Sequence, residues 1–135
     1  MREIKFRAWS EGHKKMFSPA EMGEDQLTLM PDGKGFINVS GSSTRLSQLM
    51  PHMTPLQYTG LKGKNGVEIY EGDITCRHWD DGTSQNGQII FENGSFLWQE
   101  ISQIKFIHPI GINTLHSEVI GNIYENKELL KGGKV

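Results

Sequence analysis

Acidic and imidazole side chains are concentrated in the middle of the chain, in a combination that could support metal-dependent hydrolysis. The five residues are Glu71, Asp73, His78, Asp80 and Asp81. Carboxylates can act as general acids, general bases or metal ligands. Asp and Gly are also the residues that turns favour, so two turns, at 71–73 and 80–82, are the structural alternative. Catalytic zinc needs three well-placed protein ligands, and this segment contains no recognisable set, so we expect no metal site.

The other candidate nucleophiles and ligands match no catalytic pattern. Five histidines fit neither HExxH nor zinc-finger spacing: His13, His52, His78, His108 and His116. The alternating pattern around Cys76 predicts a small buried side chain rather than a nucleophile. No serine lies in a Gly-x-Ser-x-Gly elbow, and the glycine-rich segment 60–66 lacks the ending of a phosphate loop. We therefore predict a protein that is not an enzyme, without catalytic residues, cofactor or metal.

The N-terminal segment is the clearest candidate for binding, because it combines basic and aromatic side chains. Its candidate residues are Lys5, Arg7, Trp9 and Lys15. If Lys5 and Arg7 share one face of a strand, they form a ridge that could contact phosphates or an acidic protein partner. The alternative is a solvated face whose lysines protect an edge strand from aggregation. A net charge of −2 gives no general attraction to nucleic acid.

Three tyrosines lie at or near the ends of apolar strand segments: Tyr58, Tyr70 and Tyr124. At such positions the ring can be buried while the hydroxyl reaches water, which predicts a framework role. The alternative is a stacking surface for the bases of a single strand, which would need a basic groove beside it.

Composition indicates a small globular protein. The chain has 135 residues, 36% of them hydrophobic, and 16 glycines that favour short strands and turns over long helices. The single cysteine excludes an intramolecular disulfide, and the charged start differs from a signal peptide. No apolar run approaches membrane-spanning length. We expect a cytoplasmic protein without a membrane partner.

Strand and turn signals alternate through the first part of the chain. The sequence predicts a hairpin of 4–9 with 15–17, ended by Pro19, and a second hairpin of 26–30 with 36–39 around a Pro-Asp-Gly turn. Apolar residues at helical spacing, Leu46, Leu49 and Met50, predict a short helix or a loop. Because Pro51 and Pro55 stop a helix, we place a boundary there between regions 1–55 and 56–135. One compact domain, 1–130, is the alternative.

The second part of the chain shows the same pattern. Strands are predicted at 56–58 and 68–70, with a tight turn at Asn65-Gly66, and at 74–79. A hairpin of 87–91 with 95–98 has Asn93-Gly94 at its tip. A strand or turn at 101–107, a strand at 119–124 and a helical turn at 125–130 complete the set. The predicted fold is mainly β, with short antiparallel strands, one or two short helices and a small SH3-like barrel in the C-terminal half.

Three segments resemble one protein family. They are 56–74 (LQYTGLKGKNGVEIYEGDI), 118–126 (EVIGNIYEN) and 1–9 (MREIKFRAW). Together they resemble the YopX family of phage and prophage proteins, which implies a phage or prophage origin and no established activity. The residues that we assign to this structural motif are Tyr58, Gly60, Asn65, Gly66, Tyr70, Gly72, Asp73, Gly121 and Tyr124.

Three hypotheses about function follow from these observations. The first is a non-enzymatic interaction module with a phage or host protein partner, which could also form a homo-oligomer through strand edges or apolar patches. The second is a nucleic-acid-binding module that uses the basic N-terminal strand. The third is a metal-dependent hydrolase built on the acidic and imidazole cluster, which rests on composition alone.

Overall fold

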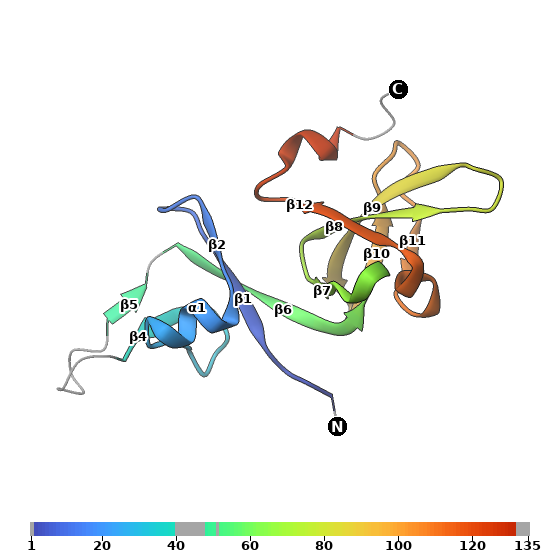
Figure 1. The fold of residues 1–135 in the computed structure, drawn as a ribbon. Helices are drawn as coiled ribbons and strands as arrows, with labels where there is room; N and C mark the ends of the chain where they lie inside the picture. Colours follow the sequence, from blue (N-terminus) through green and yellow to red (C-terminus); the bar gives the residue numbers. More distant parts are fainter. Residues whose placement is uncertain (1, 40–47, 51, 132–135) are drawn as a thin grey trace. The chain divides into compact units, whose positions relative to one another are not determined.

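The described part of the chain consists mostly of antiparallel strands. The computed structural model describes residues 2–39, 48–50 and 52–131 (Figure 1). Strands account for 48% and helices for 14% of the structure, which confirms the prediction of a mainly β fold with few short helices. The strand pairings form a four-stranded, a five-stranded and a three-stranded sheet among the described residues. None of the described helices has the length and apolar character that crossing a membrane would need.

The chain divides into two compact units. The N-terminal unit is Ile4–Gln57, and the C-terminal unit contains the described residues from Tyr58 onward together with the few that precede Ile4. Strand β6 (Met53–Lys62) runs through the division. The predicted division into regions 1–55 and 56–135 stays a prediction, and so does its alternative of one compact domain, 1–130.

The N-terminal unit begins with the predicted hairpin. Strands β1 (Phe6–Ser10) and β2 (Lys15–Phe17) pair antiparallel, and β1 also pairs with the first half of β6. Pro55 lies inside β6, opposite Ala8. A proline is tolerated there because, among the described residues, this half of β6 pairs only with β1, and its other edge needs no backbone N–H donor.

Helix α1 (Pro19–Glu24) was not predicted. The sequence predicts only the end of the hairpin at Pro19, whereas a helix starts there in the structure. Ser18 is the N-cap: its Oγ accepts from Glu21 N–H at 3.1 Å, and Glu21 Oε1 accepts from Ser18 N–H at 3.0 Å. This reciprocal capping box, with proline at the first helical position, favours a helix start. The Ser-Pro-x-Glu signal was therefore available in the sequence.

The second predicted hairpin is confirmed and gains a third strand. Strands β3 (Leu27–Leu29) and β4 (Phe36–Asn38) pair antiparallel around the Pro-Asp-Gly turn. Strand β5 (Gln48–Met50) then pairs with β4, so the expected helix or loop is wrong for these residues. A short apolar run does not distinguish helix from strand, and pairing with β4 decides the outcome. The rest of that predicted segment, including Leu46, lies outside the described residues.

A cluster of four buried side chains forms the core of the N-terminal unit: Ala8, Met22, Phe36 and Met53. Phe6, Phe17, Leu27 and Leu29 pack against it. The cluster combines strands β1, β4 and β6 with α1, so burial of apolar surface ties these elements together.

The first elements of the C-terminal unit are two paired strands joined by a turn that the sequence predicts. The second half of β6 pairs with β7 (Glu68–Tyr70), and the 3-10 helix η2 (Lys64–Gly66) lies between them. Asn65 and Gly66 have φ of 63° and 76°, so the predicted positive φ angles are confirmed. The register shifts between Tyr58 and Lys62, where Gly60 has a φ of 90°. Such a bulge increases the local twist of the strand.

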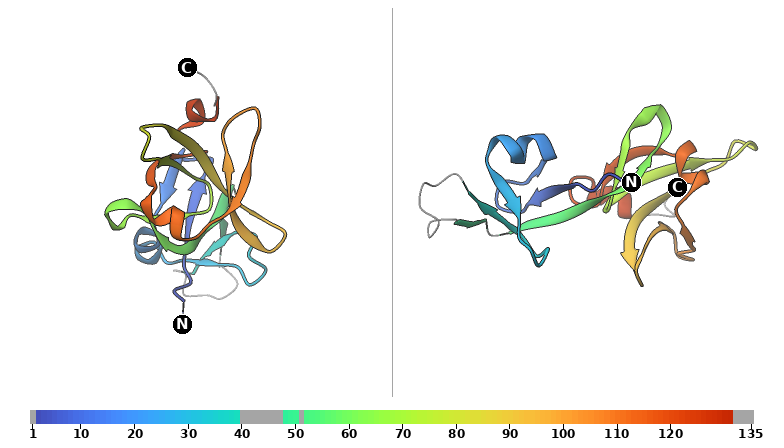
Figure 2. Two further views of the ribbon diagram at one scale, coloured as in Figure 1. Left: turned by 90° about the vertical axis from the view of Figure 1, so that its right-hand side faces the viewer. Right: turned by 90° about the horizontal axis from the view of Figure 1, so that it is seen from below.

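Five strands in the order β11-β10-β9-β8-β12 form a curved, half-barrel sheet (Figure 2). They are β8 (Asp73–His78), β9 (Ser84–Glu92), β10 (Ser95–Glu100), β11 (Ile107–Pro109) and β12 (Glu118–Asn122). The hairpin of β9 with β10 turns at Asn93-Gly94, where φ is 52° and 80°, as predicted. The 3-10 helices η3 (Ile112–His116) and η4 (Lys127–Leu130) precede and follow β12. The SH3-like comparison stays a prediction.

Three buried residues form the core of this unit: Ile69, Ile89 and Trp98. The indole of Trp98 lies where a side chain at Gly87 would project, because a Cβ there would be 2.0 Å from the ring. Trp98 Nε1, on β10, donates to Thr75 Oγ1, on β8, at 2.9 Å across the intervening strand β9. Gly87 is therefore needed for the close approach of the ring to the sheet.

Candidate functional site

The four candidate binding residues of the N-terminal segment, Lys5, Arg7, Trp9 and Lys15, are not all exposed to solvent. Trp9 is 5% exposed, and its Nε1 donates to Glu11 Oε1 at 3.0 Å. Arg7 lies within β1 and is partly buried, as is Lys5 just before the strand. A buried indole offers no open face for stacking, so the structure supplies a basic strand without an aromatic platform at Trp9. A binding role for these residues stays a prediction.

Lys15 forms an ion pair inside its own unit. Its Nζ lies 2.8 Å from Glu21 Oε2 and 4.7 Å from the centroid of the Phe17 ring. The hydrogen bond and charge of Glu21 raise the pKa of Lys15. The hydrogen bond from Lys15, followed by the Ser18 N–H, lowers the pKa of Glu21 to about 2. Lys15 therefore holds the start of α1 to β2.

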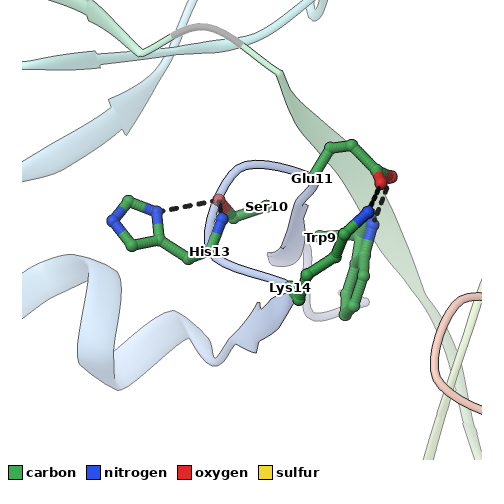
Figure 3. A network of polar contacts seen from close by, with 5 residues as sticks. All are labelled: Trp9, Ser10, Glu11, His13 and Lys14. Atoms are coloured by element: carbon green, nitrogen blue, oxygen red, sulfur yellow. Dashed lines mark hydrogen bonds and ion pairs between the residues drawn. The ribbon is translucent and has the colours of Figure 1, made fainter.

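The turn between β1 and β2 contains a serine and a histidine in contact. Ser10 Oγ lies 3.1 Å from His13 Nδ1, and the His13 backbone N–H donates to the same Oγ at 3.2 Å (Figure 3). Lys14 pairs with Glu11 on the opposite side of the turn. Ser–His pairs activate nucleophiles in hydrolases. Here Ser10 is 2% exposed and accepts a backbone N–H, so the contact closes the turn.

A cavity of about 440 Å³ adjoins this turn and will be called the N-terminal cavity. Its polar side chains include His13, His52 and Asp25, and its apolar ones Phe17, Leu27 and Met53. The described residues contain no group of three His, Cys, Asp or Glu side chains placed to hold a metal. The cavity thus combines two histidines and one acid without forming a metal centre.

The acidic residues Asp73 and Asp81 belong to two separate turn regions: Asp73 begins strand β8 directly after one turn, and Asp81 lies within the next. Asp73 is 1% exposed, and its Oδ2 accepts from Tyr70 N–H at 2.8 Å, while Gly72 has a φ of 89°. Asp81 Oδ1 accepts from the backbone N–H and the hydroxyl of Thr83, and these bonds lower the pKa of Asp81. Both carboxylates therefore stabilise turns. Nothing among the described residues assembles them with His78 into a ligand set.

The tyrosines and glycines of the signature segments shape the backbone. Tyr58 and Tyr70 are 4% and 5% exposed, pair across β6 and β7, and have ring centroids 5.4 Å apart. Tyr124 donates its backbone N–H to Asn122 Oδ1 at 3.0 Å. Gly121 lies at the register shift of β12, where a Cβ would be 2.4 Å from Asn126 Oδ1. The signature residues therefore act on local geometry.

Asn122 is a buried structural residue that sequence reasoning missed. Its Oδ1 accepts from the backbone N–H groups of Tyr124 and Glu125, and its Nδ2 donates to Glu125 Oε1 at 2.8 Å. Asn126 Oδ1 in turn accepts from Asn122 N–H at 3.1 Å. The Asn-x-x-x-Asn spacing after a strand was the available signal, because Asn side chains commonly close turns with backbone groups.

A second cavity, of about 310 Å³, lies in the C-terminal unit and will be called the C-terminal cavity. Its described lining is Arg77, Trp98, His108, Pro109, Gly111, Thr114 and Ser117. Arg77 Cζ lies 4.9 Å from the centroid of the Trp79 ring, and the rings of Trp98 and His108 have centroids 5.7 Å apart. The volume is near the lower end of small-ligand sites, about 300 to 1,000 Å³. The lining combines one cation, aromatic surface and hydroxyl groups.

Sequence reasoning did not select the residues of the C-terminal cavity. They come from β8, β10, β11 and η3, which the sheet brings together. Arg77-x-Trp79 was the one local signal, because side chains two positions apart lie on the same face of a strand.

Exposed apolar side chains are concentrated beside this cavity. Ile104, Phe106 and Ile107 are 68%, 56% and 47% exposed, and they lie in or just before the edge strand β11. The Phe106 ring centroid is 6.3 Å from that of His108, which lines the cavity. Clustered apolar exposure of this kind is typical of interaction sites.

Comparisons with known proteins identify relatives of uncharacterised activity. A family model described as YopX protein matches residues 5–131. The solved structure of protein EF1440 from Enterococcus faecalis is 30% identical, covers 96% of this chain and 99% of its own, and has a TM-score of 0.64. Protein yopX from Bacillus subtilis is 21% identical, covers 99% and 100%, and has a TM-score of 0.63, a likeness in fold. Among curated proteins there was no match.

Proposed function

The chain belongs to the YopX family, and we propose that it is a non-enzymatic accessory module, of phage or prophage origin, that binds a protein partner in the cytoplasm. The observation that carries this proposal is the apolar edge segment, defined as 104–107 with strand β11. Three large apolar side chains there are 47% exposed or more. Burial of such side chains on a partner would be favourable by about 25 cal/mol for each Å² removed from water.

The arrangement of polar groups supports binding over catalysis. The candidate catalytic carboxylates Asp73 and Asp81 accept backbone hydrogen bonds in turns. Ser10 is buried and serves the β1–β2 turn. General acid–base and nucleophilic catalysis require groups that can reach a substrate atom. The edge segment, in contrast, is open to a partner.

Capture from a lysate of infected or induced host cells tests the proposal. The tagged protein is compared with an Ile104→Ser, Ile107→Ser double variant, and half of each sample is treated with nuclease. We expect one nuclease-resistant protein to be retained by the original chain and lost by the double variant. A matched control, Val39→Ser with Val67→Ser, removes two apolar side chains that are 46% and 48% exposed elsewhere. Equal loss in both variants, or capture only through nucleic acid, would reject the proposal.

Self-association is the homo-oligomeric form of this proposal, because an edge strand of one copy can pair with that of another. Light scattering over a range of concentrations measures it directly. A mass that stays at one chain at the highest concentration would reject self-association and leave the binding of a different protein as the proposal.

A further inference from the structure

We propose that the C-terminal cavity binds a carboxylate carried by an extended peptide segment that lies along β11. This inference rests on the proposed function and deepens it, because it specifies the chemistry of the partner. The probe that represents the partner is a short acidic peptide in strand conformation.

The cationic side chain in the lining of the C-terminal cavity favours an anionic ligand. Arg77 is the one Lys, Arg, Asp or Glu residue of the described lining, which therefore contains a cation and no carboxylate. Within the described part of the chain Arg77 has no salt bridge, and its recorded contact is with the Trp79 ring. That contact holds the planar guanidinium while leaving its N–H groups able to donate. A guanidinium donates two parallel hydrogen bonds to a carboxylate, which gives direction as well as attraction.

A hydroxyl group is also available. Thr114 is 6% exposed, lines the cavity, and its Oγ1 accepts from Gly111 N–H at 3.0 Å. Among the described residues its hydroxyl proton has no recorded acceptor. A buried hydroxyl gains when a ligand oxygen accepts that proton. Trp98 and Pro109 supply apolar wall on which the stem of an acidic side chain can lie.

The backbone of β11 favours an extended occupant. Glu100 N–H donates to Phe106 O at 2.7 Å, so these opposite residues form a hydrogen-bonded pair of the ladder. Bonded and non-bonded pairs alternate in antiparallel sheets, and Ile107 is opposite Gln99 in the next pair. The N–H and C=O of Ile107 therefore point away from β10, toward the outer edge of the sheet. A strand added at this edge can exchange both bonds with Ile107.

The same geometry places a side chain of the added strand at the cavity. His108 projects to the cavity side of β11, where it contacts Trp98. In a sheet, residues opposite each other on neighbouring strands project to the same face. The residue of the peptide opposite His108 therefore projects beside His108, toward Arg77 and Thr114. We assign the acidic residue to that position.

A nucleic acid fits this site less well than a peptide. Phosphate-backbone binding depends on several cations that neutralise successive phosphates. Here the lining contains one arginine, and the chain has a net charge of −2. Exposed Ile104 and Ile107 beside the site match apolar side chains of a peptide rather than a ribose-phosphate backbone.

Titration of the isotope-labelled full chain by NMR tests the inference, with the indole N–H of Trp98 as reporter. The first probe is a pentapeptide of alternating Thr and Val with a central Glu, acetylated and amidated at its ends. A second peptide has Gln at the centre. A third has the central Gln and a free C-terminal carboxylate, which separates a side-chain from a terminal source. We expect the Glu peptide to bind with a Kd on the order of 1 mM or below, as a few charge-assisted bonds would give.

Substitution of Arg77 tests the assigned contact. We expect R77Q to weaken binding of the Glu peptide about tenfold or more, and R77K to have an intermediate effect because it keeps charge but loses the paired donors. The matched control is K34Q, which removes one exposed positive charge in the N-terminal unit and should leave binding unchanged. Thermal unfolding of each variant shows whether it folds. If R77Q does not fold, R77K is used in its place to test the contact.

The outcomes are distinct. Measurable binding of the Glu and Gln peptides with equal affinity overturns the inference, and so does the absence of a Trp98 shift with all three peptides. Stronger binding of inorganic phosphate or of a ten-nucleotide oligo-dT than of the Glu peptide also overturns it. Binding through the third peptide alone retains the carboxylate site and assigns it to a chain terminus. If the captured protein is lost with the Ile104, Ile107 variant but kept with R77Q, the proposed function stands and this inference fails.

Discussion

The two cavities differ in the charges that line them, although each belongs to a unit of short antiparallel strands. The N-terminal cavity contains Asp25 with His13 and His52, whereas the C-terminal cavity contains Arg77 and no described carboxylate. Around the first, Ser10 and His13 are occupied by the turn that they close. The second adjoins an edge strand with exposed apolar side chains. The difference indicates that the polar side chains beside the N-terminal cavity close a turn, whereas Arg77 beside the C-terminal cavity forms no salt bridge with any described residue.

The largest expected effect comes from the core of the N-terminal unit. Phe36→Ala removes a ring that is 2% exposed from a cluster shared by β1, β4, β6 and α1. We expect a loss of about 3 to 5 kcal/mol in the free energy of unfolding, measured by urea denaturation. V39A, at a side chain 46% exposed, is the matched control and should change it by less than about 0.5 kcal/mol. Similar small losses in both variants would contradict a packed core in this unit.

A smaller effect is expected at the close approach in the C-terminal unit. Gly87→Ala places a Cβ 2.0 Å from the Trp98 ring, which forces the indole from its position. We expect a loss of about 1 to 3 kcal/mol in unfolding free energy and a changed chemical shift for the Trp98 indole N–H.

Gly12→Ala is the control for this comparison, because a Cβ at Gly12 meets no atom within 4 Å. A change of less than about 0.5 kcal/mol is expected there. If G87A also leaves stability and the indole signal unchanged, the indole does not pack on Gly87, and the wall of the C-terminal cavity is assigned wrongly.

The smallest effect concerns the ion pair between Lys15 and Glu21. Its hydrogen bonds lower the pKa of Glu21 from 4.5 to about 2, so the unfolded chain binds its proton more readily than the folded chain does. The stabilisation is present above pH 4.5 and is lost as the pH falls toward 2. We expect E21Q to flatten this part of the pH dependence of stability, and only slightly, because both side chains are largely exposed.

Lys15→Gln provides the matched test, since it removes the charged hydrogen-bond donor that contributes most to the lowered pKa of Glu21. Chemical denaturation at several pH values between 2 and 6 gives the slopes. A K15Q slope equal to that of the original chain would show that the ion pair does not hold α1 to β2 in solution.

Local signals made much of the fold predictable. Asn65-Gly66 and Asn93-Gly94 adopt the positive φ angles that their residue types favour, and strands flank them as alternation indicates. The Ser18-Pro19-x-Glu21 signal of α1 is also local, although the sequence prediction uses only Pro19, as the end of a hairpin. Strand β5 was not predictable in this way, because its three residues take their conformation from pairing with β4.

The candidate site was much less predictable than the fold. The acidic residues with catalytic potential, Asp73 and Asp81, accept backbone hydrogen bonds that close turns, which is the structural role that the sequence offered as the alternative to catalysis. Arg77 and His108 belong to no recognisable sequence motif. They line one cavity because β8 and β11 belong to one curved sheet. Residues separated by that much chain have no short-range pattern from which their proximity follows.

The sequence by itself determined the family, the mainly β class and the positions of the main turns, because residue type acts locally on backbone φ and strand alternation. Only the tertiary structure decided which of the candidate side chains are buried, which form ion pairs and which line a cavity. Trp9 is buried, Lys15 is paired with Glu21, and Arg77 lies at a cavity whose described lining contains no carboxylate. The physical reason is that burial and electrostatic pairing depend on neighbours brought together by sheet register, which no single segment of the chain specifies.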